Sequence, residues 1–290
     1  MSGIKLNPVI QNLVLEANGQ ETIVSLEFQN NEPQSRLVTF SIRDFSTTGK
    51  EGQIQFLQPG EGAFRLSPFT RLVTPDKAIV ESGELYTIKV AITADPKLPP
   101  TGYYGAVVAQ VADPLATGTL GVQPAISSLL MVRLNGRGEE KLALKSVESD
   151  NTLFRLPTQA TLSIQNPGEV HTAPRGRILL LSPRQTIIAR GTVNEDSSYV
   201  LPGVERFYGT PLKIVDSEPW YQQIGIYELV TEYRADGNAR PSFDREDVVY
   251  INPYIVLIAL LAITILVLAL RWVSFRFRLA ERISKFLKKS

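Results

Sequence analysis

One uninterrupted apolar segment near the C-terminal end constrains this chain more than any other feature. Residues 248–270 read VVYINPYIVLIALLAITILVLAL and contain no charged side chain. A helix needs about 20 apolar residues to cross the ~30 Å hydrocarbon core of a bilayer. Tyr250 and Tyr254 lie at one edge of the segment and Trp272 at the other, where interfacial aromatic residues are expected. The sequence therefore predicts a single transmembrane helix over residues 248–270.

The charges on either side of this segment predict its orientation. Residues 271–290 carry seven basic side chains and one acidic side chain, which gives a net charge of +6. The whole chain has a net charge of +1, which leaves −5 for residues 1–270. Because basic flanks stay in the cytoplasm, we expect residues 1–247 outside a cell membrane crossed once, with the tail inside. Met1-Ser2-Gly3 does not read as a signal peptide, so the two possibilities are a removed leader and a tail-anchored chain.

The basic tail also has an amphipathic pattern. Trp272, Phe275, Leu279 and Ile283 recur at a spacing of three to four residues, with basic residues between them. On a helix this spacing gives one apolar face and one cationic face, which suits contact with an anionic lipid leaflet. A tail that only fixes the topology is the other interpretation. The predicted membrane interface consists of Tyr250, Tyr254, Arg271, Trp272, Arg276 and Arg278.

The residues before the span predict β-strands. Apolar and polar side chains alternate with period two at 24–29, 38–43 and 86–92, and turn-forming Asn, Gly and Pro separate these runs. Short strands with regular spacing favour antiparallel sandwiches. We expect a mostly β fold with two tandem immunoglobulin-like β-sandwich domains, followed by a single transmembrane α-helix and a short amphipathic basic tail. The predicted boundaries are 1–135 for the first domain, 136–140 for a polar hinge, 141–247 for the second domain, 248–270 for the helix and 271–290 for the tail.

The two predicted domains share landmarks. Leu26–Asn30, with Pro33 shortly after, has a counterpart in Leu162–Asn166, with Pro167 directly after. In both domains a later strand opens with a Gly-x-Tyr sequence. The tyrosine of this sequence is Tyr104 in the first domain and Tyr227 in the second. We expect each asparagine to support a turn and each tyrosine to pack its ring and bond its hydroxyl to nearby backbone. These landmarks predict a tandem of related domains.

Several segments together resemble a known family. They are TPDKAIVESGELYTIKVAI at 74–92, LPPTGYYGAVVAQV at 98–111, LSIQNPGEV at 162–170 and GIYELVTEY at 225–233. The pattern is similar to bacterial WxL-interacting cell-surface proteins and, more loosely, to the PapD-type sandwich. The resemblance covers nearly the whole chain, because that family also has two sandwiches, one transmembrane helix and a basic tail. It implies a surface protein whose first domain contacts cell-wall glycan and whose second domain contacts other proteins.

The side-chain inventory argues against chemistry. The chain has no cysteine and a single histidine, His171, which excludes thiol nucleophiles and ordinary zinc sites. It has no phosphate-binding glycine motif and no calcium loop. His171 follows a predicted turn, so we expect it to be solvated. Because residues 1–270 are net acidic, nucleic acid is not an expected partner. We therefore expect no enzymatic activity, no cofactor and no metal.

Aromatic residues in two loop-rich segments form the candidate interaction surface. They are Phe56, Phe64 and Phe69 in one segment and Trp220 and Tyr221 in the other. Such rings can stack on sugars or anchor a protein partner. For Trp220 and Tyr221, the other interpretation is that they cap the sandwich core near the membrane.

The sequence as a whole predicts a membrane-anchored surface binding or scaffold protein. Its two β-sandwich domains would bind cell-wall polymer, partner surface proteins, or both. Two other functions are weighed against this one. The first is a PapD-like, membrane-tethered assembly chaperone, because sandwiches can accept or donate a strand. The second is a membrane-anchored, polysaccharide-active enzyme, because carboxylate pairs form in space and not in sequence.

Overall fold

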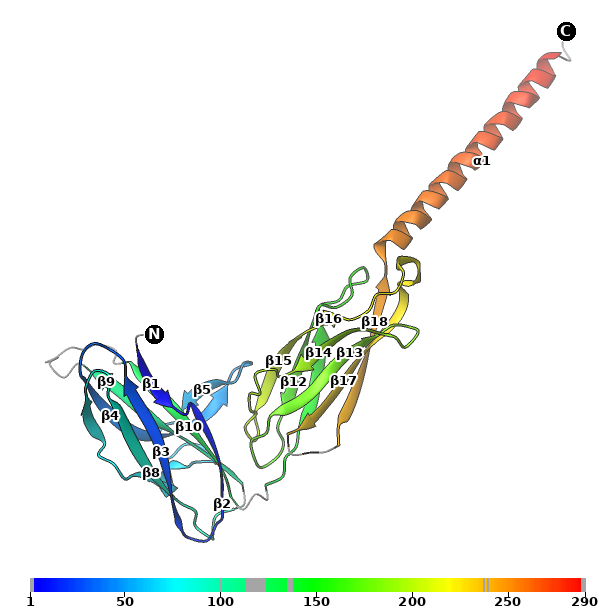
Figure 1. Ribbon diagram of the computed structural model, residues 1–290. Coiled ribbons are helices and arrows are strands. Elements are labelled where there is room, and N and C mark those ends of the chain that lie inside the picture. The colour runs from blue at the N-terminus through cyan, green and yellow to red at the C-terminus, as the bar shows by residue number, and fades with distance from the viewer. Residues whose placement is uncertain are drawn as a thin grey trace.

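The chain folds into two β-sandwich domains followed by one long apolar helix (Figure 1). The structure is a computed structural model that describes residues 3–99, 101–112, 124–134, 138–236, 238 and 240–287, with side chains up to residue 276. The predicted mostly β fold class is confirmed.

The first domain packs two sheets face to face. One sheet has the order β1 (Ile4–Asn7), β3 (Glu21–Asn30), β8 (Leu85–Thr93) and β6 (Thr70–Leu72). The other has the order β2 (Ile10–Leu15), β10 (Ala125–Leu134), β9 (Gly102–Ala112), β4 (Arg36–Thr48) and β5 (Gln53–Phe56), with β7 (Lys77–Val80) also on β4. The short 3₁₀ helix η1 (Ser67–Phe69) precedes β6. The chain changes sheet between β1 and β2, and β2 then runs parallel to β10.

The second domain repeats this arrangement with fewer strands. Its smaller sheet has the order β11 (Ala143–Ser149), β12 (Gln159–Gln165) and β15 (Glu205–Pro211). Its larger sheet has the order β16 (Lys213–Ile214), β14 (Ile187–Val193), β13 (Pro174–Leu181), β17 (Ile224–Ala235) and β18 (Ser242–Ile251). The short 3₁₀ helix η2 (Trp220–Gln222) precedes β17. The pairing of β17 with β13 and β18 corresponds to that of β9 with β4 and β10 in the first domain.

Each domain has its own core, built from alternate residues of its strands. Along β3, the inward positions Val24, Leu26 and Phe28 are buried while the residues between them face solvent. This follows from the period of two that a strand imposes on its side chains. The largest fully buried side chains are Leu26, Phe28, Leu66, Ile88, Ile92, Tyr104 and Leu130 in the first domain and Leu162, Ile164, Ile178, Leu180 and Tyr227 in the second.

The predicted repeat is visible in the hydrogen bonds of two buried asparagines. The Asn30 and Asn166 amides each donate to the carbonyl four residues ahead and to a second carbonyl from a distant part of the chain. Each side-chain oxygen accepts the N–H two residues ahead. The same residue therefore supports the same turn in both domains.

The helix α1 (Pro253–Leu287) begins later than the sequence predicted and does not stop at residue 270. Residues 248–251 complete β18, because Val248 and Tyr250 point into the second core. Tyr250, expected at the membrane edge, instead lies edge-on to Tyr227, with ring centroids 5.7 Å apart. Proline suits the first turn of a helix, where its missing N–H leaves no bond unmade. Within the described residues, α1 is the one helix long and apolar enough to cross a membrane.

Candidate functional site

The two domains meet at a buried cluster of rings centred on Tyr104 of β9. Tyr104 is 2% exposed and lies edge-on to the rings of Phe45, Phe64 and His171. Its hydroxyl accepts the backbone N–H of His171 at 2.9 Å. Burial raises the pKa of the Tyr104 phenol, so the hydroxyl stays protonated. The sequence predicted a hydroxyl bonded to nearby backbone, but the partner belongs to the other domain.

His171 lies inside the same junction. It is 1% exposed, and its ring lies edge-on to those of Tyr104 and Tyr199, with centroids 5.6 Å and 5.3 Å away. Burial and, to a lesser degree, the nearby Arg133 charge lower the pKa of His171 to about 3. The imidazole is therefore neutral at neutral pH. The prediction of a solvated histidine is wrong, because the turn that carries it packs against the first domain.

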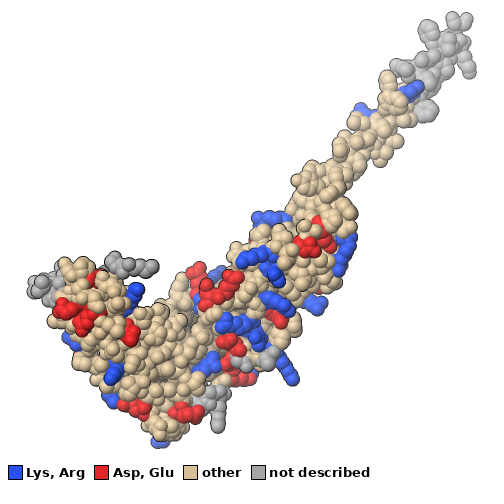
Figure 2. Space-filling model, viewed as in Figure 1, with Lys and Arg blue, Asp and Glu red and all other residues tan. Residues whose placement is uncertain are grey.

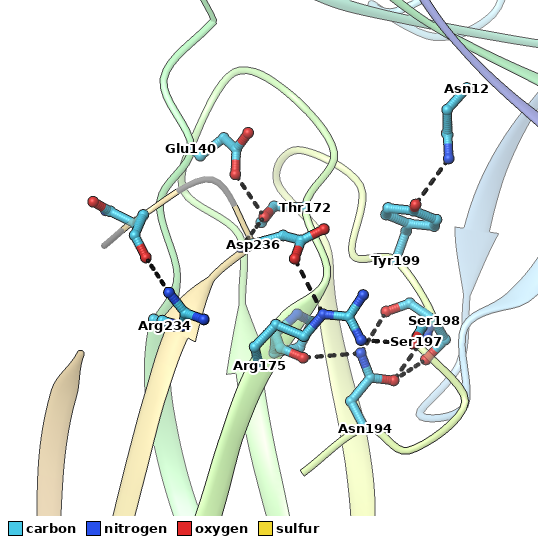
Figure 3. Close-up of polar contacts among 12 residues, drawn as sticks. Asn12, Glu140, Thr172, Arg175, Asn194, Ser197, Ser198, Tyr199, Arg234 and Asp236 are labelled. Carbon is cyan, nitrogen blue, oxygen red and sulfur yellow. Dashed lines mark hydrogen bonds and ion pairs between the residues drawn. The ribbon is translucent and has the colours of Figure 1, made fainter. Parts of the chain in front are cut away.

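A mostly buried ion pair ties the same segments together. Arg133, at the end of β10, pairs with Glu140 and donates to the His171 carbonyl at 2.6 Å. The Thr172 hydroxyl donates to Glu140 at 3.0 Å and accepts the N–H of Asp236 at 3.2 Å (Figure 3). Because charge-assisted hydrogen bonds are among the stronger polar contacts in proteins, this network stabilises one arrangement of the two domains.

Further contacts join the domains away from the ion pair. The Asn12 amide of β2 donates to the Tyr199 hydroxyl at 2.8 Å (Figure 3). The Phe207 N–H of β15 donates to the Lys50 carbonyl at 2.8 Å, and the Lys50 ammonium lies 5.0 Å from the centre of the Phe207 ring. Residues 136 and 137 of the predicted hinge lie outside the described residues. The ring cluster, the ion pair and these further contacts fix the two domains to each other.

A groove of about 520 Å³ opens beside this junction. Three aromatic rings line it, and those of Phe69 and Tyr103 meet edge-on with centroids 5.8 Å apart. Glu169 of the second domain forms part of the rim, and its carbonyl accepts the Thr101 hydroxyl and the Gly102 N–H. The full lining is Ala63, Phe64, Arg65, Pro68, Phe69, Leu98, Pro99, Thr101, Tyr103 and Glu169. Both domains therefore build the groove.

The aromatic wall of this groove is held by a buried carboxylate. Asp44 of β4 accepts the N–H groups of Leu66 and Ser67 at 2.9 Å and 2.8 Å, and also the Ser67 hydroxyl. Residue 105 is glycine at the point where this segment crosses β9. A Cβ there would lie 3.0 Å from the Leu66 Cβ, so the missing side chain permits the close approach. No local sequence signal indicates this contact, because Asp44 and Leu66 meet only in the fold.

The aromatic residues predicted from the sequence separate into three places. Phe64 and Phe69 line the groove. Phe56 packs against the buried junction cluster and is not an open surface. Trp220 and Tyr221 are exposed at the opposite end of the second domain, beside the start of α1. Within the described residues, no group of three or more histidine, aspartate or glutamate side chains could hold a metal ion.

A second groove, missed by the sequence reasoning, lies over β14 and β16 and encloses about 860 Å³. Arg190 and Lys213 face each other directly across these strands, and no ion pair joins either one in the part of the chain that the structure describes. Exposed Ile187 and Ile214 lie beside them. Like charges directly opposite each other destabilise a sheet, so the pair suits an acidic partner. Only strand register brings the two cations together, which is why their spacing in sequence gave no signal.

The remaining predicted membrane-interface residues lie on the surface of α1. Tyr254, Arg271, Trp272 and Arg276 are all exposed on the helix. The Arg276 guanidinium lies 5.2 Å from the centre of the Trp272 ring. The surface of α1 carries no charge from its start to Arg271 (Figure 2). The side chain of Arg278 lies outside the described residues.

Solved structures similar to this chain include several chaperones, among them chaperones of fimbriae and pilins. The class 5 fimbriae chaperone CfaA has a TM-score of 0.40 and 11% identity, covering 84% of this chain and 99% of that chain. The YadV chaperone has a TM-score of 0.40 and 14% identity, with coverages of 84% and 99%. A complex of the Salmonella enterica SafA pilin with the SafB chaperone gives 0.40 and 14%, with coverages of 84% and 96%. No protein-family model matches the chain, and no curated protein matches it. The geometry of the junction and its groove therefore carries the functional argument.

Proposed function

We propose that this protein is a non-enzymatic, membrane-anchored surface protein that binds cell-wall glycan in the aromatic groove between its two domains. The observation that carries this proposal is that both domains build the groove while a buried junction fixes them to each other. A site of that kind needs little reorganisation on binding, and pre-organisation favours affinity.

The lining of the groove favours a sugar ligand. Half-buried Phe64 and Phe69 present ring surfaces with buried Tyr103 behind them, while Arg65 and Glu169 supply polar groups at the rim. Pockets that combine apolar rings with a few placed polar groups are typical binding sites. The resemblance to WxL-interacting proteins implies glycan contact by the first domain, which supplies most of this lining. The second groove, with Arg190 and Lys213, would hold an acidic segment of a partner surface protein.

The alternative as a polysaccharide-active enzyme is less favoured by the same lining. Glycoside hydrolysis ordinarily uses two carboxylic side chains that flank the bond being broken. The described lining of the aromatic groove contains one carboxylate, Glu169. We therefore propose binding without hydrolysis.

The alternative as an assembly chaperone is less favoured by the pairing of β10. From Leu129 to Arg133 this strand is paired with β9 on one side and with β2 on the other. A strand that is paired on both edges offers no free backbone to a partner strand. Strand donation by this part of β10 would first require that β2 be displaced.

The anchor is part of the proposal. We infer that α1 crosses the membrane once, with residues 1–251 outside and the basic end of the helix in the cytoplasm. The support is its uncharged surface from Pro253 to Leu270, followed by Arg271 and Arg276. Basic flanks are retained on the cytoplasmic side. The outer position of the two sandwiches would place the groove toward a cell wall.

The test is binding of soluble peptidoglycan fragments to the full-length protein in lipid nanodiscs. Phe69→Ala and Arg65→Ala are expected to weaken binding by about tenfold each, since aromatic and arginine side chains dominate binding energies. Ile79→Ala, an exposed apolar residue on β7, is the matched control and is expected to have no effect. Thermal unfolding of each variant separates loss of binding from loss of fold.

Three outcomes would overturn the proposal. The first is wild-type affinity in both groove variants. The second is binding that depends on Arg190 and Lys213 and not on the aromatic groove. The third is glycan cleavage that is lost in Glu169→Gln, which would make the protein an enzyme.

A further inference from the structure

The loop between β11 and β12 carries two apolar residues that the turn does not need. Thr152 and Arg155 exchange backbone hydrogen bonds of 2.9 Å and 3.1 Å, so Leu153 and Phe154 form the tip of a tight turn. Turn positions favour Gly, Asn, Asp and Pro for conformational reasons. Here the tip residues are 45% and 50% exposed. The conformation of the turn therefore does not explain why these two exposed positions are apolar.

The shape of this loop is fixed by the aspartate that precedes the tip. The Asp150 carboxylate accepts the Thr158 hydroxyl at 2.7 Å and the N–H groups of Thr158 and Gln159 at 2.7 Å and 2.9 Å. These bonds lower the pKa of Asp150 to about 2, so the carboxylate stays ionised and the bonds persist at neutral pH. The apolar tip is consequently held out in one position.

A second exposed apolar pair lies at the same end of the domain. Trp220 and Tyr221 of η2 meet edge-on, with ring centroids 5.8 Å apart, and are 46% and 59% exposed. On the outer face of the neighbouring strands, Ile224 pairs with Ile251 and Ile226 with Val249. Ile224, Ile226 and Val249 are exposed. The next outward pair along these strands is Glu228 with Asp247, so the surface changes from apolar to charged with distance from α1.

Both apolar pairs are tied to the start of α1. The Ile251 N–H donates to the Leu153 carbonyl at 2.8 Å. The Asn252 amide donates to the Gln223 side-chain oxygen at 2.6 Å, and its own side-chain oxygen accepts the Tyr254 N–H at 2.9 Å as a helix cap. Asn252 is the one residue between β18 and α1. The loops therefore cannot move independently of the helix, and they lie at the end of the domain from which α1 leaves (Figure 1).

The length of the uncharged part of α1 determines how close the helix-proximal end of the second domain lies to the bilayer. From Pro253 to Leu270 the helix rises about 27 Å, at about 1.5 Å per residue. The hydrocarbon core is ~30 Å thick, so the whole uncharged stretch is needed to cross it. Pro253 must then lie at the outer boundary of the hydrocarbon. The loops bound to Ile251 and Asn252 consequently lie at the level of the lipid headgroups.

We propose that the membrane-proximal end of the second domain is itself seated in the outer bilayer interface. The contact, here called the membrane lip, consists of Leu153, Phe154, Trp220, Tyr221 and Ile224. This inference rests on α1 spanning the membrane, as proposed above. Amphipathic aromatic rings are favoured at the headgroup level, and the tip residues gain free energy by leaving water. The lip and the capped helix together hold the ectodomain at one orientation and one height above the membrane.

The chain contains two tryptophans, one at each predicted interface, which allows a direct test. Trp272→Phe leaves Trp220 as the only tryptophan, and Trp220→Phe leaves Trp272. Each full-length variant is placed in vesicles whose phospholipid acyl chains are brominated near the headgroup. The lip predicts that bromine quenches both tryptophans and that Trp220 resists aqueous iodide. Bromination near the chain terminus is expected to quench both less.

A second variant tests whether the tip contributes to the seating of Trp220. In the Trp272→Phe background, Leu153→Ser with Phe154→Ser is expected to lower lipid quenching of Trp220 and to raise iodide quenching. Phe243→Ser is the control, because it removes an exposed apolar residue of β18 that lies at the far end from α1.

The outcomes separate the lip from the anchor. Iodide quenching of Trp220 without lipid quenching, while Trp272 is quenched by lipid, would overturn the lip and keep the span. Absence of lipid quenching for both tryptophans would overturn the span and the lip together. Protection of Trp220 from iodide without lipid quenching would show that protein and not lipid covers this end, which also overturns the proposal.

Discussion

The two ends of the second domain both carry aromatic side chains, which are buried at one end and exposed at the other. At the end facing the first domain, His171 is buried and packs against Tyr104 and Tyr199. At the end facing α1, Trp220 and Tyr221 are about half exposed. The first set of rings is covered by protein, and for the second set we propose lipid as the cover. The difference shows that aromatic content alone does not identify a binding surface, because what covers a ring decides its role.

The largest expected effect is at the buried end. Tyr104→Ala removes a fully buried ring and leaves the His171 N–H without its acceptor. We expect it to lower the free energy of opening of the junction by about 3–5 kcal/mol, as for other large-to-small core changes. Hydrogen exchange in the full-length protein measures this at β9 and at residue 171. Tyr227→Ala, an equally buried ring in the second core, should accelerate exchange in the second domain while residues of β9 stay protected. Wild-type protection at residue 171 in Tyr104→Ala would contradict the role of the hydroxyl.

The junction ion pair gives the next effect. Arg133→Met removes one ion-pair partner of Glu140 and the donor to the His171 carbonyl. Loss of a partner for a mostly buried polar group costs about 1–3 kcal/mol. Because the chain has no cysteine, spin labels can be placed at Ile79→Cys and Phe243→Cys without further changes. We expect a broader distance distribution between these labels in Arg133→Met.

The control for this experiment is an ion pair on the surface. Arg71→Met breaks the exposed pair with Glu21 within the first domain. Exposed pairs contribute little to stability, so the distance distribution should match that of the wild type. A narrow distribution in Arg133→Met would mean that the ring cluster and the other contacts between the domains fix their arrangement without the ion pair.

His171 makes the junction sensitive to acid. Burial first, and then Arg133, lower its pKa to about 3 in the folded protein, against an ordinary histidine pKa of 6.5. The unfolded chain therefore binds a proton that the folded chain does not, between these two values. The contribution to stability is complete above pH 6.5 and is lost as the pH falls toward 3. At pH 5 the loss relative to pH 8 is about 2 kcal/mol.

The variant His171→Phe isolates this contribution. Phenylalanine keeps a ring against Tyr104 and Tyr199 and cannot take up a proton. The unfolding free energy of the variant should therefore fall less than that of the wild type between pH 8 and pH 5. Parallel pH profiles for the two proteins would show that His171 gains solvent before the junction opens.

The sequence predicted those features whose signal is local. The period-two runs predicted the strands, and the matching asparagines predicted the repeat, because each pattern is written within a few residues. The junction could not be predicted in the same way. Tyr104 and His171 meet only after both domains have folded, and Asp44 reaches Leu66 only across the first domain.

The predicted start of the membrane helix was wrong for a related reason. Hydropathy alone could not separate residues 248–251 from the span, because a buried edge strand and a membrane helix are equally apolar. The alternation of Val248 and Tyr250 was hidden by the apolar residues between and after them. Exposed Val249 and half-buried Ile251 belong to the stripe beside the membrane lip, so the apolar run contributes to the core and to the surface beside the proposed lip.

A smaller effect is expected where the domain joins α1. Asn252→Ala removes the cap on the Tyr254 N–H and the bond to Gln223. Loss of such a cap typically costs about 1 kcal/mol. Hydrogen exchange of residues 254–256 in nanodiscs should increase, while the amides of the buried junction keep their protection. Asn252→Asp retains a capping oxygen and should restore protection at the helix start. Faster exchange in both variants would indicate that the Gln223 bond and not the cap holds the joint.

The smallest expected effect is at the exposed end, and it decides between the two interpretations of Trp220. In the detergent-solubilised full-length protein, Trp220→Ser should change the unfolding free energy of the second domain by no more than about 0.5 kcal/mol, as for most surface substitutions. Tyr199→Ser, at the buried end, removes the ring against His171 and the acceptor of the Asn12 amide, so its cost should be clearly larger. A cost for Trp220→Ser equal to that of Tyr199→Ser would show that Trp220 caps the sandwich core. A small cost of Trp220→Ser in detergent, together with lipid quenching of Trp220 in the Trp272→Phe protein in vesicles, is the result that lipid contact requires.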